Sequence, residues 1–369
     1  MSQRPNLVTI DAGAFARNIG KVRAGLRRSV DIFQVCKGDG YGLGVENAVR
    51  LGLAAGIRAF CVGDPDEALR AREVAPAAEI LLFPSALPQA LAPLAARGIT
   101  LTAHNRESLH AILEAGAEAR FFFKVETGLS RYGFCEGDWA DVLGAYARTG
   151  WTSCRGVYSH LGQAMREHAG ESLKRFDGHL RVARRHIRHD FASMVASSLT
   201  LCAHPDLPCS AVDPGRLLYG MLSGDECPAF RTEPVVERIS SRLLQVTGFE
   251  KGQRVRIGYA DGIEIPAGGR IGVFPIGTLD GLSSGNALGE VLIGGQPAKA
   301  IGRTLMHSIV DLGRHGQAAV GDEVVLVGRQ ANREISLLQC AQSMNTSVTA
   351  LHFSLVRNLP KLVRAEKAN

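Results

Sequence analysis

The stretch DIFQVCKGDGYGLG, residues 31–44, is the most informative part of this 369-residue sequence. It begins as a short apolar run, as expected for a strand buried on both faces, and it ends in a glycine-rich turn. Lys37 stands where that strand would end. A lysine is a poor core residue, and its amine can condense with an aldehyde, so Lys37 is a candidate Schiff-base lysine.

The same unit, an apolar run followed by an amphipathic segment, recurs along the first two-thirds of the chain. Eight such units predict an α/β fold in which the chain forms a parallel, TIM-like (β/α)8 barrel. The expected strands span residues 31–37, 59–63, 79–84, 99–105, 120–127, 154–162, 193–198 and 210–220. Polar side chains at their carboxyl ends would meet at one face of the barrel, where barrel active sites lie.

After about residue 235 the character of the sequence changes. Valine, isoleucine, arginine and glycine dominate, turn signals recur and helical periodicity fades, which predicts a mostly β C-terminal domain. We therefore place a barrel domain at residues 1–235 and a β-rich domain at 236–369. The first strand of the chain could join the β-rich domain, and a closing helix is expected at residues 347–357.

Composition limits the classes of partner. The net charge is +6, but the basic residues are scattered and no nucleic-acid-binding motif accompanies them, so we expect no nucleic-acid partner. No apolar run is long enough to span a membrane, and MSQRPNLVTIDAGAF does not resemble a signal peptide. The eight cysteines form no CxxC pair, so we expect packed thiols in a reducing, cytoplasmic compartment and no metal site.

A phosphate-binding cup is expected after the last two barrel strands. Ser198 ends the seventh expected strand, and Gly215 and Arg216 follow Pro214 in the eighth. Loops at these positions often hold phosphate in barrels of this kind. Tyr41, four residues after Lys37, could add a hydroxyl group.

Three further polar residues follow the middle strands. The fifth expected strand carries Lys124, Arg131 closes the run KVETGLSR, and His160 closes the sixth strand. Each alone is a weak signal, but their position at successive strand ends predicts one shared site.

Several motifs resemble those of the alanine racemase family, and their order and spacing hold from about Val8 to Pro360. The resemblance implies a fold-type III pyridoxal-phosphate enzyme with a barrel, a β domain and an amino-acid substrate. It also implies a head-to-tail homodimer in which each β domain completes the other subunit's site. The motifs are VCKGDGYGLG (35–44), KVETGLSRYGF (124–134), GVYSHLG (156–162), VDPGRLLYG (212–220), IGRTLMH (301–307) and VGDEVVLVG (320–328).

The resemblance implies roles for the residues that match these motifs. Lys37 would hold pyridoxal 5'-phosphate as a Schiff base and act as the base on one face of the substrate. The phosphate would be held by Tyr41, Ser198, Gly215 and Arg216, the last two through backbone N–H groups.

Other matching residues would surround the ring and the substrate. Arg131 would face the phenolic oxygen of the cofactor or the substrate carboxylate. Lys124 would support Arg131, and it is carbamylated in many relatives. His160 would lie beside the pyridine ring, and Met306 would offer a backbone N–H to the substrate carboxylate.

The second base depends on the register of the alignment. GYADG (258–262) first looks like the family's downstream GYADG motif, but Arg303 and Met306 would then lie too far along the chain. The better register places VRIGYADG (255–262) on the family's earlier segment, which carries the catalytic tyrosine. Tyr259 then becomes the base for the opposite face, and Thr278 replaces the tyrosine at the substrate entrance.

The sequence departs from the family pattern at four places. Asp213 stands where racemases have an arginine beside the pyridine nitrogen, and a carboxylate there favours protonation of the ring. Thr278 and His307 replace the entrance tyrosine and an aspartate, so the substrate need not be alanine. The late phosphate tyrosine falls on Val363 or is absent.

These observations leave different functions open. One is an amino-acid racemase with Lys37 and Tyr259 as opposed bases. Another is a lyase, aldolase, decarboxylase or aminotransferase-like enzyme on the same scaffold, which Asp213 favours. A third, a cofactor-binding carrier without turnover, is disfavoured because both bases are present.

Overall fold

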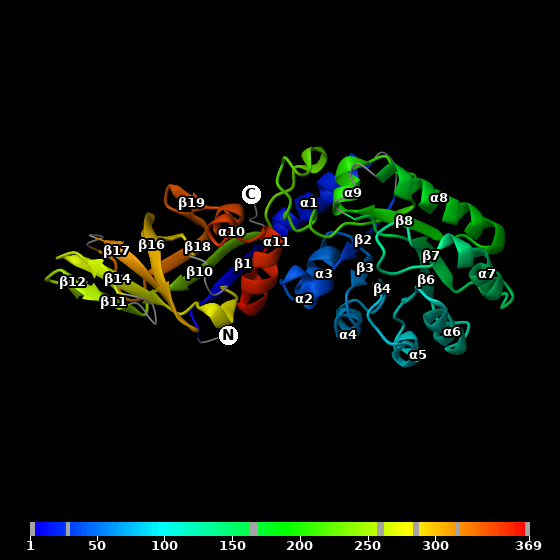
Figure 1. Ribbon diagram of the computed structural model, residues 1–369, viewed down its shortest axis with the longest axis horizontal. Helices are drawn as coiled ribbons and strands as arrows, with labels where there is room; N and C mark the ends of the chain where they lie inside the picture. The colour runs from blue at the N-terminus through cyan, green and yellow to red at the C-terminus, as the bar shows by residue number, and fades with distance from the viewer. Residues whose placement is uncertain are drawn as a thin grey trace. The chain divides into compact units, whose positions relative to one another are not determined.

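The computed structural model describes residues 4–26, 30–162, 169–256, 262–282, 288–313 and 317–365 (Figure 1). The chain divides into two compact units. One is Ala14–Glu233, and the other combines Met1–Gly13 with Pro234–Asn369. The beginning of the chain therefore belongs to the same unit as its last third.

The first unit is an eight-stranded parallel barrel, which confirms the predicted fold class. The sheet order is β4-β3-β2-β9-β8-β7-β6-β5, and a parallel bridge between Leu81 and Thr100 brings β4 beside β5. The strands are β2 (Asp31–Val35), β3 (Ala59–Val62), β4 (Glu79–Leu82), β5 (Leu101–Ala103), β6 (Phe121–Lys124), β7 (Cys154–Tyr158), β8 (Ala192–Ser197) and β9 (Ala211–Asp213). Each lies within one residue of, or inside, an expected strand.

The first helix precedes the barrel strands, and the others follow them in the chain (Figure 1). They are α1 (Ala12–Gly25), α2 (Lys37–Tyr41), α3 (Val45–Ala54), α4 (Pro65–Val74), α5 (Leu91–Ala96), α6 (Arg106–Glu114), α7 (Glu136–Ala147), α8 (Ala169–His186) and α9 (Ser198–Ala203). The barrel interior is filled by aromatic side chains, with Phe33 and Phe122 edge to face at 5.7 Å between ring centroids. Every residue of β6 is buried, as in a strand covered on both sides.

The second unit is built mainly from one large sheet of order β11-β14-β17-β16-β15-β18-β10-β1-β20. Strand β1 (Leu7–Asp11) pairs antiparallel with β10 (Val236–Arg242) and parallel with β20 (Lys361–Arg364). The remaining strands of this sheet are β11 (Gln245–Phe249), β14 (Gly269–Phe274), β15 (Glu290–Ile293), β16 (Gln296–Arg303), β17 (Ser308–Gly313), β18 (Glu323–Gln330) and β19 (Arg333–Ile335). Strands β12 (Gln253–Val255) and β13 (Ile263–Ile265) form a separate hairpin.

Two short helical segments accompany this sheet. The helix expected at residues 347–357 is present as α11 (Val348–Leu351), continued by a π-helical turn at His352–Val356. Helix α10 (Leu337–Ser343) was not predicted, although Ser336 and Gln339 form a capping box at its start. No helix in the described ranges has both the length and the apolar composition needed to cross a bilayer.

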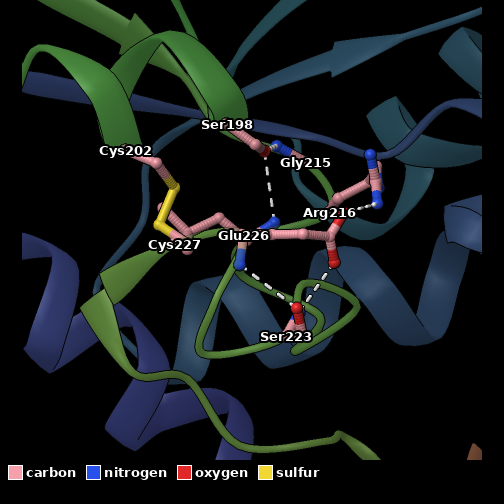
Figure 2. The surroundings of a disulfide bond; sticks show 8 residues. Ser198, Cys202, Gly215, Arg216, Ser223, Glu226 and Cys227 are labelled. Atoms are coloured by element: carbon pink, nitrogen blue, oxygen red, sulfur yellow. Dashed lines mark hydrogen bonds and ion pairs between the residues drawn. A yellow bond between two sulfur atoms is a disulfide. The ribbon is translucent and has the colours of Figure 1, made fainter. Parts of the chain in front are cut away.

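The cysteines correct one expectation. Cys202 and Cys227 form a disulfide with 5.0 Å between their Cα atoms, whereas the sequence predicts packed thiols (Figure 2). The other six cysteines remain thiols. The pair is 25 residues apart in sequence, and only the fold brings α9 beside the segment after β9, so no local pattern could reveal it.

Candidate active site

One cavity of about 660 Å³ collects every site residue predicted in the barrel. These residues are Lys37, Tyr41, Lys124, Arg131, His160, Ser198, Asp213, Gly215 and Arg216. The side chains come from the carboxyl ends of different strands, because β6 ends at Lys124 and β9 ends at Asp213. The cavity is thus at the barrel face where parallel strands present their functional groups.

Lys37 begins a left-handed turn. Residues 38–41 all have positive φ, with values of 68°, 54°, 64° and 55° in chain order. Glycine adopts this conformation at little cost, but Asp39 and Tyr41 do not. The backbone also passes close to β3, because a Cβ added to Gly63 would lie 2.9 Å from the Cβ of Lys37.

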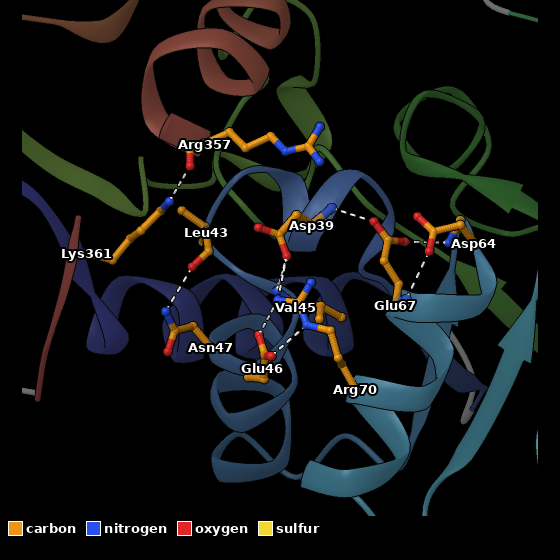
Figure 3. Close-up of polar contacts among 11 residues, drawn as sticks. Asp39, Leu43, Val45, Glu46, Asn47, Asp64, Glu67, Arg70, Arg357 and Lys361 are labelled. Atoms are coloured by element: carbon orange, nitrogen blue, oxygen red, sulfur yellow. Dashed lines mark hydrogen bonds and ion pairs between the residues drawn. The ribbon is translucent and has the colours of Figure 1, made fainter. Parts of the chain in front are cut away.

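A polar network holds this turn (Figure 3). The backbone N–H of Asp39 donates to Glu67 at 2.5 Å, and the other carboxylate oxygen of Glu67 accepts from the N–H of Gly63 at 2.8 Å. The side chain of Asp39 accepts from the N–H of Val45 at 3.1 Å and from Arg70 at 2.9 Å. These bonds offset part of the conformational cost and fix the position from which Lys37 projects.

The charges in the cavity alter one another's protonation. Burial lowers the pKa of Lys37, although Asp213 opposes this shift. Burial lowers the pKa of Lys124 to about 8, again against the effect of Asp213. A buried lysine with a lowered pKa presents more of its neutral, nucleophilic amine near neutrality.

Asp213 is the buried carboxyl group of the cavity. Burial raises its pKa to about 7, while Lys124 and Lys37 act in the opposite direction. Within the described part of the chain, its Oδ1 atom has no hydrogen-bond partner. A buried carboxylate oxygen without a hydrogen-bond partner costs free energy, and a ligand that donates a hydrogen bond to it would remove this cost. Asp213 is therefore placed to bind a hydrogen-bond donor or a basic nitrogen.

An aromatic wall lies beside these charges. The rings of Phe83 and Tyr158 are stacked at 5.9 Å, and the ammonium group of Lys124 lies 4.6 Å from the centre of the Tyr158 ring. Burial and nearby cations lower the pKa of His160 to about 3, so its imidazole is neutral near neutrality. A neutral imidazole can pack against a ring without adding a positive charge.

Polar groups gather around Ser198, which also lines the cavity (Figure 2). The hydroxyl of Ser198 accepts from the N–H of Gly215 at 2.9 Å and from the N–H of Leu217 at 3.1 Å. The hydroxyl group of Tyr41 lies so close to Gly215 that a Cβ there would overlap it. Hydroxyl and backbone N–H groups gathered beside Arg216 suit the oxygens of a phosphate.

The predicted substrate residues of the second unit form a separate cluster. The N–H of Thr278 donates to the carbonyl of Thr304 at 3.2 Å, and the N–H of His307 donates to the hydroxyl of Thr304 at 3.2 Å. Met306 is exposed in the same turn. The backbones approach closely because a Cβ on Gly277 would lie 2.5 Å from the carbonyl oxygen of Leu305. Tyr259 lies outside the described residues.

Sequence reasoning missed several residues of the site. Tyr158 stands inside the quoted run GVYSHLG, so its position in that run was a usable signal. Glu226 lines the cavity and pairs with Arg216 at 3.2 Å. Glu67 acts across 28 residues of sequence, and only the fold reveals its contact with Asp39.

Comparison with known proteins agrees with this architecture. The family models for the alanine racemase N-terminal and C-terminal domains match residues 10–223 and 236–363. The alanine racemase of Mycolicibacterium smegmatis is 31% identical, over 94% of this chain and 90% of its own length. The alanine racemase of Lacticaseibacillus casei is 29% identical, over 99% and 98%.

Solved structures are similar as well. The crystal structure of alanine racemase from E. faecalis has a TM-score of 0.87 and 25% identity, and the match covers 98% of each chain. Both family models together span almost the whole sequence. The chain therefore belongs to the alanine racemase family of pyridoxal-phosphate-dependent isomerases.

Proposed function

We propose that this protein is an amino-acid racemase that uses pyridoxal 5'-phosphate, with Lys37 and Tyr259 as the two opposed bases. The observation that carries the proposal is the half-buried Lys37 side chain, whose pKa is lowered, in the same cavity as the other predicted barrel residues. The substrate is an amino acid that need not be alanine, because Thr278 and His307 differ from the family pattern.

The cavity fits this cofactor. Lys37 supplies an amine for its aldehyde, and Asp213 offers an oxygen that lacks a partner among the described residues. Ser198, Tyr41 and Arg216 would hold its phosphate group, together with the N–H of Gly215, which donates to the Ser198 hydroxyl in this structure. When bound, the cofactor withdraws electrons from the α-carbon of an amino acid and so acidifies its proton.

The protein's own groups would then move that proton. Racemisation needs a base on each face of the α-carbon, so that one removes the proton and the other returns it from the opposite side. Lys37 would serve one face and Tyr259 the other. Arg131 would hold the substrate carboxylate or the phenolic oxygen of the cofactor, while Met306 would donate its backbone N–H to the carboxylate.

Labelling tests the cofactor assignment. Incubation with pyridoxal 5'-phosphate followed by borohydride should fix a pyridoxyl group on Lys37, which peptide mass spectrometry locates. Lys37→Ala should carry no label, whereas Lys299→Ala, which removes a strand lysine from the second unit, should be labelled normally at Lys37. Label on another lysine would overturn the assignment.

Exchange with deuterated water tests the two bases. Wild-type protein should incorporate α-deuterium from both enantiomers of its substrate, identified from an amino-acid panel. Tyr259→Phe should lose exchange with one enantiomer by about 10²–10⁴-fold and keep it with the other, because a single base is removed. Equal loss with both enantiomers, or none, would reject the two-base assignment.

A second candidate function rests on Asp213. A carboxylate beside the pyridine nitrogen stabilises the protonated ring and so deepens the electron sink, which suits decarboxylation, aldol cleavage, β-elimination or transamination. The same panel separates these outcomes, because a lyase or aminotransferase changes the carbon skeleton or yields a keto acid instead of the opposite enantiomer.

We also propose a homodimer with shared active sites. Leu279, Leu305 and Met306 are exposed large apolar side chains on neighbouring turns of the second unit, since the N–H of Leu279 donates to the carbonyl of Leu305 at 2.9 Å. An exposed apolar patch of this kind supports a protein partner. Sedimentation would test the dimer.

A further inference from the structure

Figure 2 shows the Cys202–Cys227 disulfide together with Ser198, Gly215 and Arg216, which with Tyr41 form the expected phosphate-binding cup. Helix α9 carries Ser198 at its first residue and Cys202 one turn later, so both side chains occupy the same side of the helix. Ser198 accepts from the N–H groups of Gly215 and Leu217. Cys202 thus anchors the element that supplies the hydroxyl group of the cup.

The other cysteine belongs to the segment that holds Arg216. Cys227 follows Glu226, whose carboxylate pairs with Arg216 at 3.2 Å. The same carboxylate accepts from the N–H of Ser223 at 2.9 Å, and the N–H of Cys227 donates to the carbonyl of Ser223 at 3.1 Å. Cys227 therefore anchors the turn that orients the guanidinium group.

The polar contacts within the Arg216 turn, residues 216–227, are exposed to water. The Glu226 side chain is 46% exposed, so water screens its pairing with Arg216. Ser223 is also near the surface, in a turn closed by two local hydrogen bonds. The disulfide itself is buried, because Cys202 and Cys227 are 7% and 2% exposed. Beside the hydrogen bonds that Ser198 accepts from Gly215 and Leu217, it is a covalent link between α9 and the end of the Arg216 turn.

We infer that the Cys202–Cys227 disulfide is a covalent part of the cofactor site, which holds the two halves of the cup together and so retains the phosphate group. The inference rests on the proposed function, since the cup is taken to bind pyridoxal 5'-phosphate. Reduction by a phosphine breaks the S–S bond: the phosphine becomes its oxide with oxygen from water, and both sulfurs become thiols. The cup then loses its preorganisation, and cofactor affinity falls.

Alkylation of the denatured, unreduced protein tests the bond itself. Six of the eight cysteines should react before reduction and all eight after it, and mass spectrometry should find Cys202 and Cys227 in one linked peptide. Eight reactive thiols before reduction would overturn the inference.

Cofactor titration tests the role of the bond. The double variant Cys202→Ser and Cys227→Ser, and wild-type protein treated with a phosphine, should each have a dissociation constant for pyridoxal 5'-phosphate raised about tenfold or more. Phosphine should not change the variant further. Cys340→Ala, which removes a buried thiol of the second unit, is the matched control and should bind like wild type.

Two results separate this inference from the proposed function. If the disulfide forms but both the variant and the reduced protein bind the cofactor as wild type does, the inference fails alone. If wild-type protein does not bind the cofactor, the proposed function fails, and inorganic phosphate becomes the probe. Phosphate affinity should still fall on reduction, whereas unchanged affinity would reject the cup as well. Circular dichroism identifies any variant that does not fold, and the reduced wild type then decides.

Discussion

The carboxyl group of Asp213 is buried, and burial disfavours its charged form. Its pKa is raised to about 7 from an ordinary value of 3.8, even though Lys37 and Lys124 act in the opposite direction. The folded protein therefore binds a proton at this carboxyl group more tightly than the unfolded chain does. Between these two pKa values, a rise in pH removes stability from the folded state.

Replacement of Asp213 by asparagine should make the cofactor-free protein more stable. The amide keeps the shape of the side chain but has no charge to desolvate. The full penalty of the carboxylate is present above about pH 7, so we expect Asp213→Asn to raise the free energy of unfolding near pH 8 by about 2 to 4 kcal/mol. The difference should shrink as the pH falls and vanish near pH 4, where both side chains are neutral. Urea denaturation across this pH range measures it.

Asp190→Asn is the matched control, because Asp190 is an exposed carboxylate of the same barrel. It should leave the pH dependence of unfolding as it is in wild type. A less stable Asp213→Asn protein at pH 8 would show that the carboxylate is paired and that its burial has no net cost. If Asp213→Asn is more stable but loses turnover, Asp213 serves the reaction at a cost in stability.

At the scale of elements, α2 is the unusual part of the barrel. A left-handed turn of L-residues is disfavoured by about 1 to 2 kcal/mol for each residue, and glycines at 38, 40 and 42 relieve this cost at only some of the positions. Glu67 and Arg70 come from α4, so the neighbouring βα unit determines how Lys37 is presented. Glu67 is thus a positioning residue for Lys37.

Glu67→Gln tests this arrangement. The amide would keep the size of the side chain but weaken the bonds from the N–H groups of Asp39 and Gly63. The Glu67 carboxylate also raises the pKa of Lys37. Its replacement should therefore lower the pH midpoint at which the absorbance of the cofactor bound at Lys37 changes. We expect kcat to fall about 10- to 100-fold with a smaller change in KM, because Lys37 is misplaced by a fraction of an ångström.

Glu114→Gln, at an exposed site of α6, should change neither quantity. A Glu67→Gln protein that loses stability but keeps the wild-type pH midpoint would make Glu67 purely structural. Steady-state kinetics and a spectrophotometric pH titration together decide between these roles.

The elements also explain what could be read from the sequence. The eight barrel strands were predictable because strands buried on both faces appear as short apolar runs, as in Phe121–Lys124. The polar residues at their ends were predictable because they stand where these apolar runs end, at the barrel face that holds active sites. The left-handed turn was not, since a five-residue run of glycine and polar residues is too short to show helical periodicity. The disulfide and the Glu67 contact depend on segments that meet only after folding.

At the scale of the whole molecule, the proposed shared sites make a prediction about mixed dimers. Lys37→Ala and Tyr259→Phe should each abolish racemisation when present alone. If each site takes Lys37 from one subunit and Tyr259 from the other, a mixed dimer has one intact site and one doubly altered site. Random re-association of equal amounts should then restore about a quarter of wild-type activity.

The control is a mixture of each variant with itself, carried through the same dissociation and re-association. No recovery in the true mixture, with mixed dimers demonstrated by differently tagged chains, would place both bases in one subunit. Recovery above the self-mixed controls would support the shared site.

The pairing of β1 with both β10 and β20 has a consequence for the order in which the chain matures on the ribosome. Strand β1 is synthesised first, but its partners begin at Val236 and Lys361. Every residue of the barrel unit, Ala14–Glu233, emerges before either partner exists. The barrel can therefore fold while the edges of β1 are still unpaired, and the sheet of the second unit can close only after Lys361–Arg364 have been synthesised.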